Sequence, residues 1–138
     1  MKKKILIYLL ITVCLISIAL TALVYSFYRV DYVQEFDMSI IIGDHIGIDA
    51  GSDKLSFGMV PPGGTSVERK INIQNSRNYP LKVNVKKYGD IKGWVSVSPN
   101  SFIINQNEDK QVAFNAKTPQ SIEYGTYTGK VRFYFLKV

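Results

Sequence analysis

An uncharged, mostly apolar stretch of 24 residues at positions 5–28 constrains this chain more than any other feature. Lys2, Lys3 and Lys4 precede the stretch, and Arg29 follows it. At about 1.5 Å per residue, a helix of this length reaches roughly 36 Å and can cross a hydrocarbon core of about 30 Å with some tilt. The stretch therefore predicts a transmembrane helix.

A cleaved secretory signal is the alternative interpretation, because the lysines resemble the charged region of such a signal. The apolar core of a signal is usually only about 7–15 residues long, which is shorter than the stretch here. Bulky residues, Leu23, Val24 and Tyr25, also follow the small residues at which cleavage would be expected. Both observations favour a retained anchor.

The lysines at the N-terminus indicate the orientation of the helix, since basic residues favour the cytoplasmic side of a membrane. We therefore expect a single-pass membrane protein with a cytoplasmic N-terminus and an extracytoplasmic C-terminal domain. Tyr25, Phe27 and Tyr28 suit the aromatic belt at the outer interface. The expected organisation is a basic tail at 1–4, a transmembrane helix at 5–28, a juxtamembrane linker at 29–37 and a β-sandwich domain at 38–138.

Charge and cysteine content narrow the class of the exported domain. The chain carries a net charge of +6, but leaving out the four basic residues that flank the apolar stretch leaves 13 basic against 11 acidic residues. A domain so nearly balanced lacks the basic excess that nucleic-acid binding usually needs. The only cysteine, Cys14, lies within the apolar stretch, so we expect packing rather than a disulfide to stabilise the domain.

Beyond residue 37, apolar and polar residues alternate between short turn signals, which is the pattern of β-strands. Strands are predicted at 38–42, 54–59, 67–75, 81–88, 94–97, 102–105, 110–117 and 126–136. Their number and spacing predict an all-β, immunoglobulin-like sandwich of two sheets. The last strand is expected inside a sheet, although either it or segment 38–42 is a candidate edge for pairing with another chain.

Several segments of the chain resemble motifs of a known superfamily. They are LSFGMVPPGG at 55–64, the strand at 67–75, YPL at 79–81, WVSVSP at 94–99 and YGTYTG at 124–129. This set resembles the immunoglobulin-like superfamily that includes major sperm protein, Hydin-type and pilus-chaperone-like domains. The resemblance covers roughly residues 53–136 and implies a scaffolding or protein-binding domain without catalysis. Gly58 is expected to mark a bulge or bend, and Asn75 to satisfy backbone groups at a strand end.

Residues suited to catalysis or metal binding are sparse, so the sequence predicts no enzyme, no cofactor and no small-molecule substrate. The single histidine, His45, follows Asp44, and neighbours in a strand point to opposite faces. Asp44, Asp49 and Asp53 are alternatives for oxygen ligands of calcium, but they lack the spacing of an EF-hand. An acidic turn is the favoured interpretation of that segment.

The candidate partner-binding residues are Trp94, Arg69, Lys82 and Lys86. Trp94 is either a core residue, which we favour, or a surface anchor for a partner. The basic residues form either a solvated strand face or a contact for anionic lipid or an acidic wall polymer.

The predicted membrane anchor and β-sandwich together lead to the hypothesis of an anchored interaction or structural module of the cell envelope. Such a module contacts the lipid bilayer and another envelope protein. The alternative is a subunit of an envelope or surface-filament complex assembled through the helix. The small residues that would allow close helix packing are Ser17, Ala19, Thr21 and Ala22.

Overall fold

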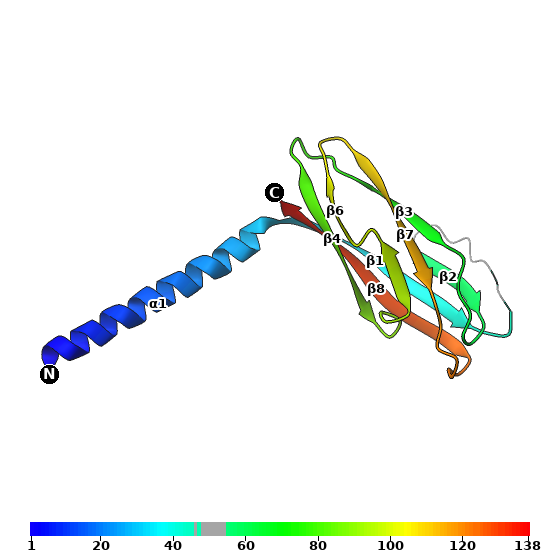
Figure 1. Cartoon of the computed structure of the whole chain (residues 1–138), viewed down its shortest axis with the longest axis horizontal. Helices are drawn as coiled ribbons and strands as arrows, with labels where there is room; N and C mark the ends of the chain where they lie inside the picture. Colours follow the sequence, from blue (N-terminus) through cyan, green and yellow to red (C-terminus); the bar gives the residue numbers. More distant parts are fainter. Residues whose placement is uncertain (46, 48–54) are drawn as a thin grey trace.

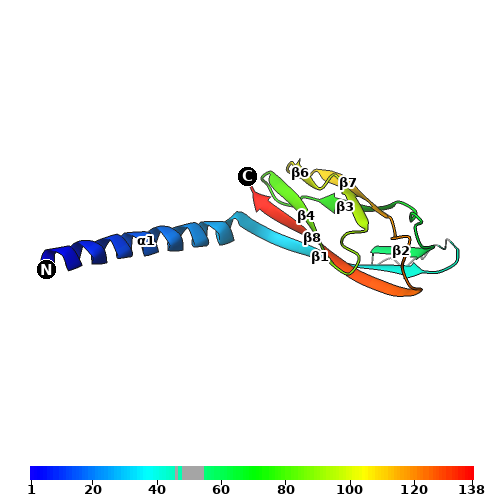
Figure 2. The same ribbon diagram turned by 60° about the horizontal axis from the view of Figure 1, so that its bottom comes forward.

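The computed structural model describes residues 1–45, 47 and 55–138, and within them one α-helix precedes eight β-strands (Figure 1). Helix α1 (Lys2–Arg29) has the length and apolar composition needed to cross a membrane, and none of its residues is buried. It projects from the domain and passes directly into the first strand, β1 (Val30–Ile42) (Figures 1 and 2). The apolar N-terminal helix predicted from the sequence is confirmed.

The remaining strands complete two sheets. They are β2 (Leu55–Val60), β3 (Arg69–Gln74), β4 (Leu81–Gly89), β5 (Val95–Ser98), β6 (Ser101–Ile104), β7 (Asp109–Ala116) and β8 (Gly125–Lys137). One sheet has the order β2-β1-β8-β4-β6 and the other the order β3-β7-β5. All eight predicted strands have a counterpart, which confirms a mostly β domain.

The two sheets share one hydrophobic core, because alternate residues of each strand point inward. Val131, Phe133 and Phe135 of β8 are fully buried, and so is Phe114 of β7. The rings of Phe114 and Phe133 meet edge to face across the sheets with centroids 6.1 Å apart. Burial of each such side chain contributes about 1.5–3 kcal/mol, so this packing holds the domain together without a disulfide.

The segment expected to be a juxtamembrane linker, 29–37, differs from that expectation. Arg29 is the last residue of α1, and β1 begins at Val30, eight residues before the predicted strand start at position 38. Tyr32 and Phe36 give the reason, since their rings contact Phe135 and Phe133 of the core strand β8. Burial of these two rings therefore stabilises the extended conformation of residues 30–37, and β1 begins directly after the helix.

The pairing of β1 and β8 decides between the two predicted edges. Strand β8 lies between β1 and β4, so the expected interior position of the last strand is confirmed. Segment 38–42 pairs with β2 on one side and β8 on the other, and the suggestion that it is a free edge is wrong. Gly58 has a positive φ of 72° where the β1–β2 register shifts, which confirms the bulge expected there.

Candidate functional site

In the part of the chain that the structure describes, the half of β1 nearest the helix has a strand partner on one side alone, and we call its other side the open edge. Residues 30–37 pair with β8, and the described pairing of β1 with β2 begins at Met38, opposite Leu55. No other described residue pairs with this part of β1. Among the residues described, the backbone groups of this half that point away from β8 have no strand partner, which makes them candidates for hydrogen bonds with a further strand.

A groove of about 440 Å³ runs between this open edge and β3, the outer strand of the second sheet. We call it the β1/β3 groove. Its lining residues are Tyr32, Gln34 and Phe36 of β1, Asn72 and Gln74 of β3, and Ser76 and Arg77 of the following loop. The lining is therefore mostly polar side chains that can donate or accept hydrogen bonds, with two aromatic rings among them.

The aromatic residues of the groove are fixed by the core. The Tyr32 ring stacks on Phe135 with centroids 4.1 Å apart and an interplanar angle of 12°. The Phe36 ring meets Phe133 at 90°, with centroids 5.7 Å apart. Since both partners are fully buried in β8, this side of the groove is held rigidly in place.

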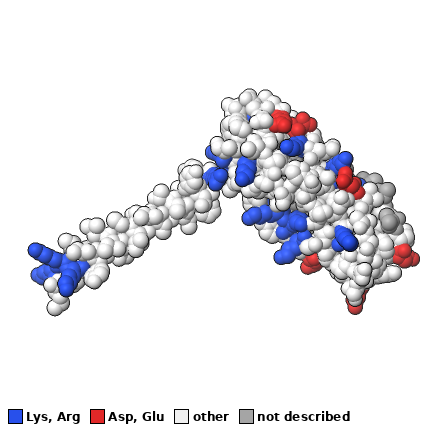
Figure 3. Space-filling view, viewed as in Figure 1, with Lys and Arg blue, Asp and Glu red and all other residues white. Residues whose placement is uncertain are grey.

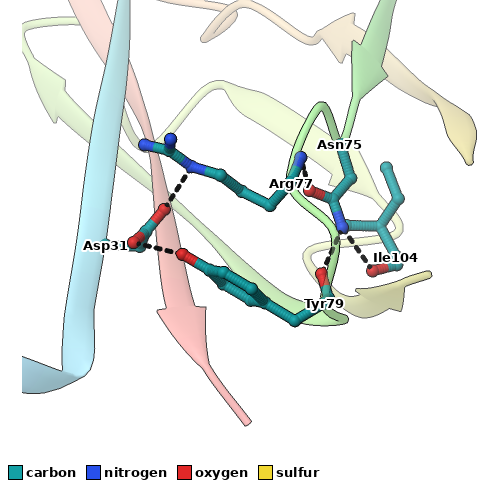
Figure 4. A network of polar contacts seen from close by, with 5 residues as sticks. All are labelled: Asp31, Asn75, Arg77, Tyr79 and Ile104. Carbon is teal, nitrogen blue, oxygen red and sulfur yellow. Dashed lines mark hydrogen bonds and ion pairs between the residues drawn. The ribbon is translucent and has the colours of Figure 1, made fainter. Parts of the chain in front are cut away.

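A polar network that includes Arg77 of the groove lining joins the start of β1 to the loop after β3 (Figure 4). We call its residues, Asp31, Asn75, Arg77 and Tyr79, the anchor clamp. The Arg77 Nε donates to Asp31 Oδ2 at 2.9 Å, and the Tyr79 hydroxyl donates to Asp31 Oδ1 at 2.9 Å. Asp31 is the second residue after α1, so the clamp ties the exit of the helix to the loop between β3 and β4.

Asn75 is the buried centre of the clamp. Its Nδ2 donates to the carbonyl oxygens of Tyr79, Ile104 and Asn105, at 2.9, 3.2 and 3.1 Å. Its Oδ1 accepts a hydrogen bond from the Arg77 backbone N–H at 2.9 Å. The role predicted for this residue at the end of a strand is confirmed, and it fixes the loop that carries Arg77 and Tyr79.

Electrostatics reinforce the clamp. The Asp31 side chain is only 9% exposed and its carboxylate is shared by two donors. The hydrogen bond to this carboxylate raises the pKa of Tyr79, and burial raises the pKa of Tyr32. Both phenols are therefore protonated at neutral pH, and Tyr79 can act as the donor that the geometry requires.

The predicted partner-binding residues do not form one cluster. Trp94 is half-buried at the margin of the core, with its ring 5.2 Å from that of Tyr127. Arg69 is half-buried at the start of β3, whereas Lys82 and Lys86 are exposed on β4 in the other sheet. Partner binding by these residues remains a prediction.

The segment around the single histidine agrees at residues 44 and 45 with the turn favoured from the sequence rather than with a strand. The His45 Nδ1 and Asp44 Oδ1 lie 2.6 Å apart, and this hydrogen bond lowers the pKa of Asp44. The side chains meet because residues 44 and 45 form a bend rather than a strand. Both are largely exposed, and the other candidate calcium ligands, Asp49 and Asp53, lie outside the described residues.

Three hydroxyl groups of α1 form hydrogen bonds with the backbone of the same helix. Thr12, Ser17 and Thr21 each donate to the carbonyl four residues earlier, at 2.8, 2.9 and 2.8 Å. Hydroxyl groups bonded in this way can face lipid without an unsatisfied donor. Assembly through the helix, which the small residues would allow, remains a prediction.

The clamp residues Asp31, Arg77 and Tyr79 escaped the sequence analysis because their partners are 46 and 48 positions apart. Within the described part of the chain, no group of three His, Cys, Asp or Glu side chains is arranged to hold a metal ion. Comparison with protein-family models, curated proteins and solved structures found no match. The open edge and the β1/β3 groove are thus the candidate binding site of the domain.

Proposed function

We propose that the chain is a membrane-anchored, extracytoplasmic interaction module of the cell envelope that binds an extended segment of another envelope protein. In this proposal the domain is an immunoglobulin-like sandwich of the superfamily that its motifs resemble, and α1 is its transmembrane anchor. Binding occurs by addition of a strand to residues 30–37 of β1. The observation that carries the proposal is the open edge directly after the helix.

The composition of the open edge supports strand addition. Soluble proteins usually protect edge strands with lysine, proline or a covering element, because unpaired backbone groups recruit other strands. Residues 30–37 contain neither lysine nor proline, and their three charged residues, Asp31, Glu35 and Asp37, form ion pairs within the domain. An eight-residue edge spans about 26 Å, which is long enough for a typical added strand.

The groove would supply specificity, since alternate side chains of an added strand would point into it. Gln34, Asn72 and Gln74 are exposed and present amide groups that suit polar or hydroxyl side chains of the partner. The anchor clamp keeps the edge in a fixed position relative to the end of α1. A partner that lies close to the membrane would therefore meet a preorganised edge.

Photo-crosslinking in intact cells tests this proposal. A photoreactive amino acid replaces Gln34 at the open edge or, as the matched control, Ser96 on the short outer strand β5. We expect one envelope protein to be crosslinked from position 34 and not from position 96. Equal crosslinking from both positions, or none from position 34, would overturn the edge as the binding site.

Protease accessibility tests the orientation on its own. In cells with a permeabilised envelope but an intact cytoplasmic membrane, we expect the β domain to be degraded and the tail at 1–4 to be protected. A domain that stays protected until the membrane is lysed would contradict the expected topology. Release of a shorter soluble chain would instead identify α1 as a cleaved signal.

A further inference from the structure

The basic residues of the domain are unevenly distributed. In Figure 3, the largest group of Lys and Arg side chains on the domain lies on the flank nearer the helix. The register of the five-stranded sheet places four basic residues, Lys82, Lys86, Lys130 and Arg132, at alternating outward positions of β4 and β8. The question is which of these charges are already neutralised.

Two of the four cations are paired within the protein. Lys130 Nζ lies 3.0 Å from Glu35 and 3.9 Å from Asp37, and Arg132 also forms an ion pair with Glu35. Among the described residues, no carboxylate lies within ion-pair distance of Lys82 or Lys86. The unneutralised charge of this face is therefore concentrated on β4.

One of the two β4 lysines has an aromatic neighbour, and a polar side chain lies between them. Lys86 Nζ lies 5.6 Å from the centroid of the Tyr134 ring, within the range of a cation–π contact. Asn84, between the two lysines on the same face, accepts a hydrogen bond from the Ser101 hydroxyl at 2.8 Å. We call Lys82, Asn84 and Lys86 the basic face, a row of donors suited to phosphate oxygens.

The register of the sheet places one end of the basic face level with the end of the helix. Val30, the first residue after α1, pairs with Leu136, which pairs with Lys82, which in turn pairs with Ile103. Ile103 is 51% exposed and lies beside Lys82 on the outer side. An apolar side chain next to a cation at this level is typical of residues at a membrane interface.

We propose that the basic face is a second membrane contact, in which Lys82 and Lys86 bind phosphate groups of anionic lipid and Ile103 enters the interface. This inference rests on the proposed function, because it requires α1 to span the membrane. No residue separates the helix from β1, so the headgroups of the same leaflet are the nearest and most concentrated anions available. An anionic wall polymer is the competing ligand that the experiment must distinguish.

Lysine acetylation measured by mass spectrometry tests the contact with the full chain in nanodiscs. One set of discs contains phosphatidylcholine alone, and the other contains about 30% phosphatidylglycerol. We expect Lys82 and Lys86 to react about threefold more slowly in the anionic discs, and high salt to remove the difference. Lys70 and Lys117, which lie on or next to the other sheet, are internal controls whose rates should not change.

Matched variants sharpen the test. The double variant Lys82→Gln/Lys86→Gln should lose the enrichment of phosphatidylglycerol over phosphatidylcholine among lipids that co-purify with the protein. The control variant Lys70→Gln/Lys117→Gln removes the same charge from the other sheet and should keep the enrichment. Circular dichroism establishes that both variants retain the β fold before the lipids are compared.

The outcomes separate the inference from the proposed function. A chain that fails to enter nanodiscs contradicts the transmembrane anchor itself. If the chain enters the discs but each of the four lysines reacts at the same rate in both lipid compositions, only the lipid contact is overturned. If soluble polyglutamate protects Lys82 and Lys86 in phosphatidylcholine discs as strongly as anionic lipid does, the lipid contact is overturned in favour of a site for an anionic polymer.

Discussion

The two halves of β1 share one strand and one partner, β8, yet they are stabilised in different ways. In the half distant from the helix, Met38, Ile40 and Ile42 are at most 2% exposed, and β2 covers the other edge. In the half next to the helix, the inward rings of Tyr32 and Phe36 are only partly buried, and the other edge has no partner among the described residues. Sheet pairing on both sides holds the first half, whereas ring contacts and the anchor clamp hold the second.

This difference indicates how a strand can remain open and ordered at once. An edge that is held by its own side chains does not need a neighbouring strand to stay extended, so its backbone groups remain available. The clamp uses a buried amide and a shared carboxylate for this purpose. Substitutions in the two halves of β1 should therefore differ in their effect on stability.

Truncation of one side chain in each half should separate them clearly. We expect Ile40→Ala to lower the free energy of unfolding by about 3 kcal/mol, because it leaves a cavity in the core. Val33→Ala, on the exposed side of the open half, should change it by less than about 0.5 kcal/mol. Chemical unfolding in detergent, followed by the fluorescence of the single tryptophan, measures both, and similar losses would show that the halves are equally packed.

Removal of the buried amide should release the clamp. We expect Asn75→Ala to cost about 2 kcal/mol, since three carbonyl oxygens and one N–H each lose a hydrogen bond inside the protein. Asn78→Ala, at an exposed position of the same loop, is the matched control and should be nearly neutral. A neutral Asn75→Ala would mean that the loop does not depend on this side chain.

The sequence predicted the strands well because alternation is a local pattern. Residues such as Val83, Phe133 and Phe135 recur at every second position, and a period of two identifies a buried face without knowledge of the partner strand. The apolar helix is equally local. Asn75 was also predicted, because a short amide side chain at the end of a strand has few other roles.

The open edge and the clamp were not predictable in the same way. Within 30–37, the polar Gln34 is paired with the buried Phe133 and the apolar Val33 lies on the outer side, which breaks the alternation of apolar and polar residues. Which strands become neighbours, and in which register they pair, is a property of the assembled sheet. Long-range register therefore limits what the sequence alone can indicate about the site.

Substitution of the shared carboxylate should weaken the clamp without removing it. We expect Asp31→Asn to cost about 1 kcal/mol, because the amide oxygen still accepts from Tyr79 but no longer attracts Arg77 as an ion. Arg77→Gln should cost a similar amount, and the double variant should cost less than the sum of the two. Strict additivity in this cycle would show that the two side chains do not interact in solution.

The same contact predicts a dependence on alkaline pH. Because the hydrogen bond to Asp31 raises the pKa of Tyr79, its contribution to stability is complete below the ordinary tyrosine value of about 10 and is lost as pH rises through the raised value. In Asp31→Asn, the pKa of Tyr79 should move back toward the ordinary value. An NMR titration of the Tyr79 ring measures the shift, and an unchanged pKa would contradict the contact.

The smallest effect is expected on the outer side of the open half, where Glu35 accepts hydrogen bonds from Arg132 and Lys130. These hydrogen bonds, the one from Arg132 first, hold the pKa of Glu35 below its usual value. Its contribution to stability is therefore present above the ordinary carboxyl value and is lost as pH falls through the lowered one.

We expect Arg132→Gln to raise the pKa of Glu35 toward its ordinary value, and Lys130→Gln to raise it less. Carboxyl NMR titrations measure both shifts, and a larger rise in Lys130→Gln would reverse the assigned order of the two partners. Because the group is exposed, the effect on unfolding should be much smaller than that of any clamp variant. The open half would then depend on its inward contacts with the clamp and β8, and its outward charges could vary without closing the edge.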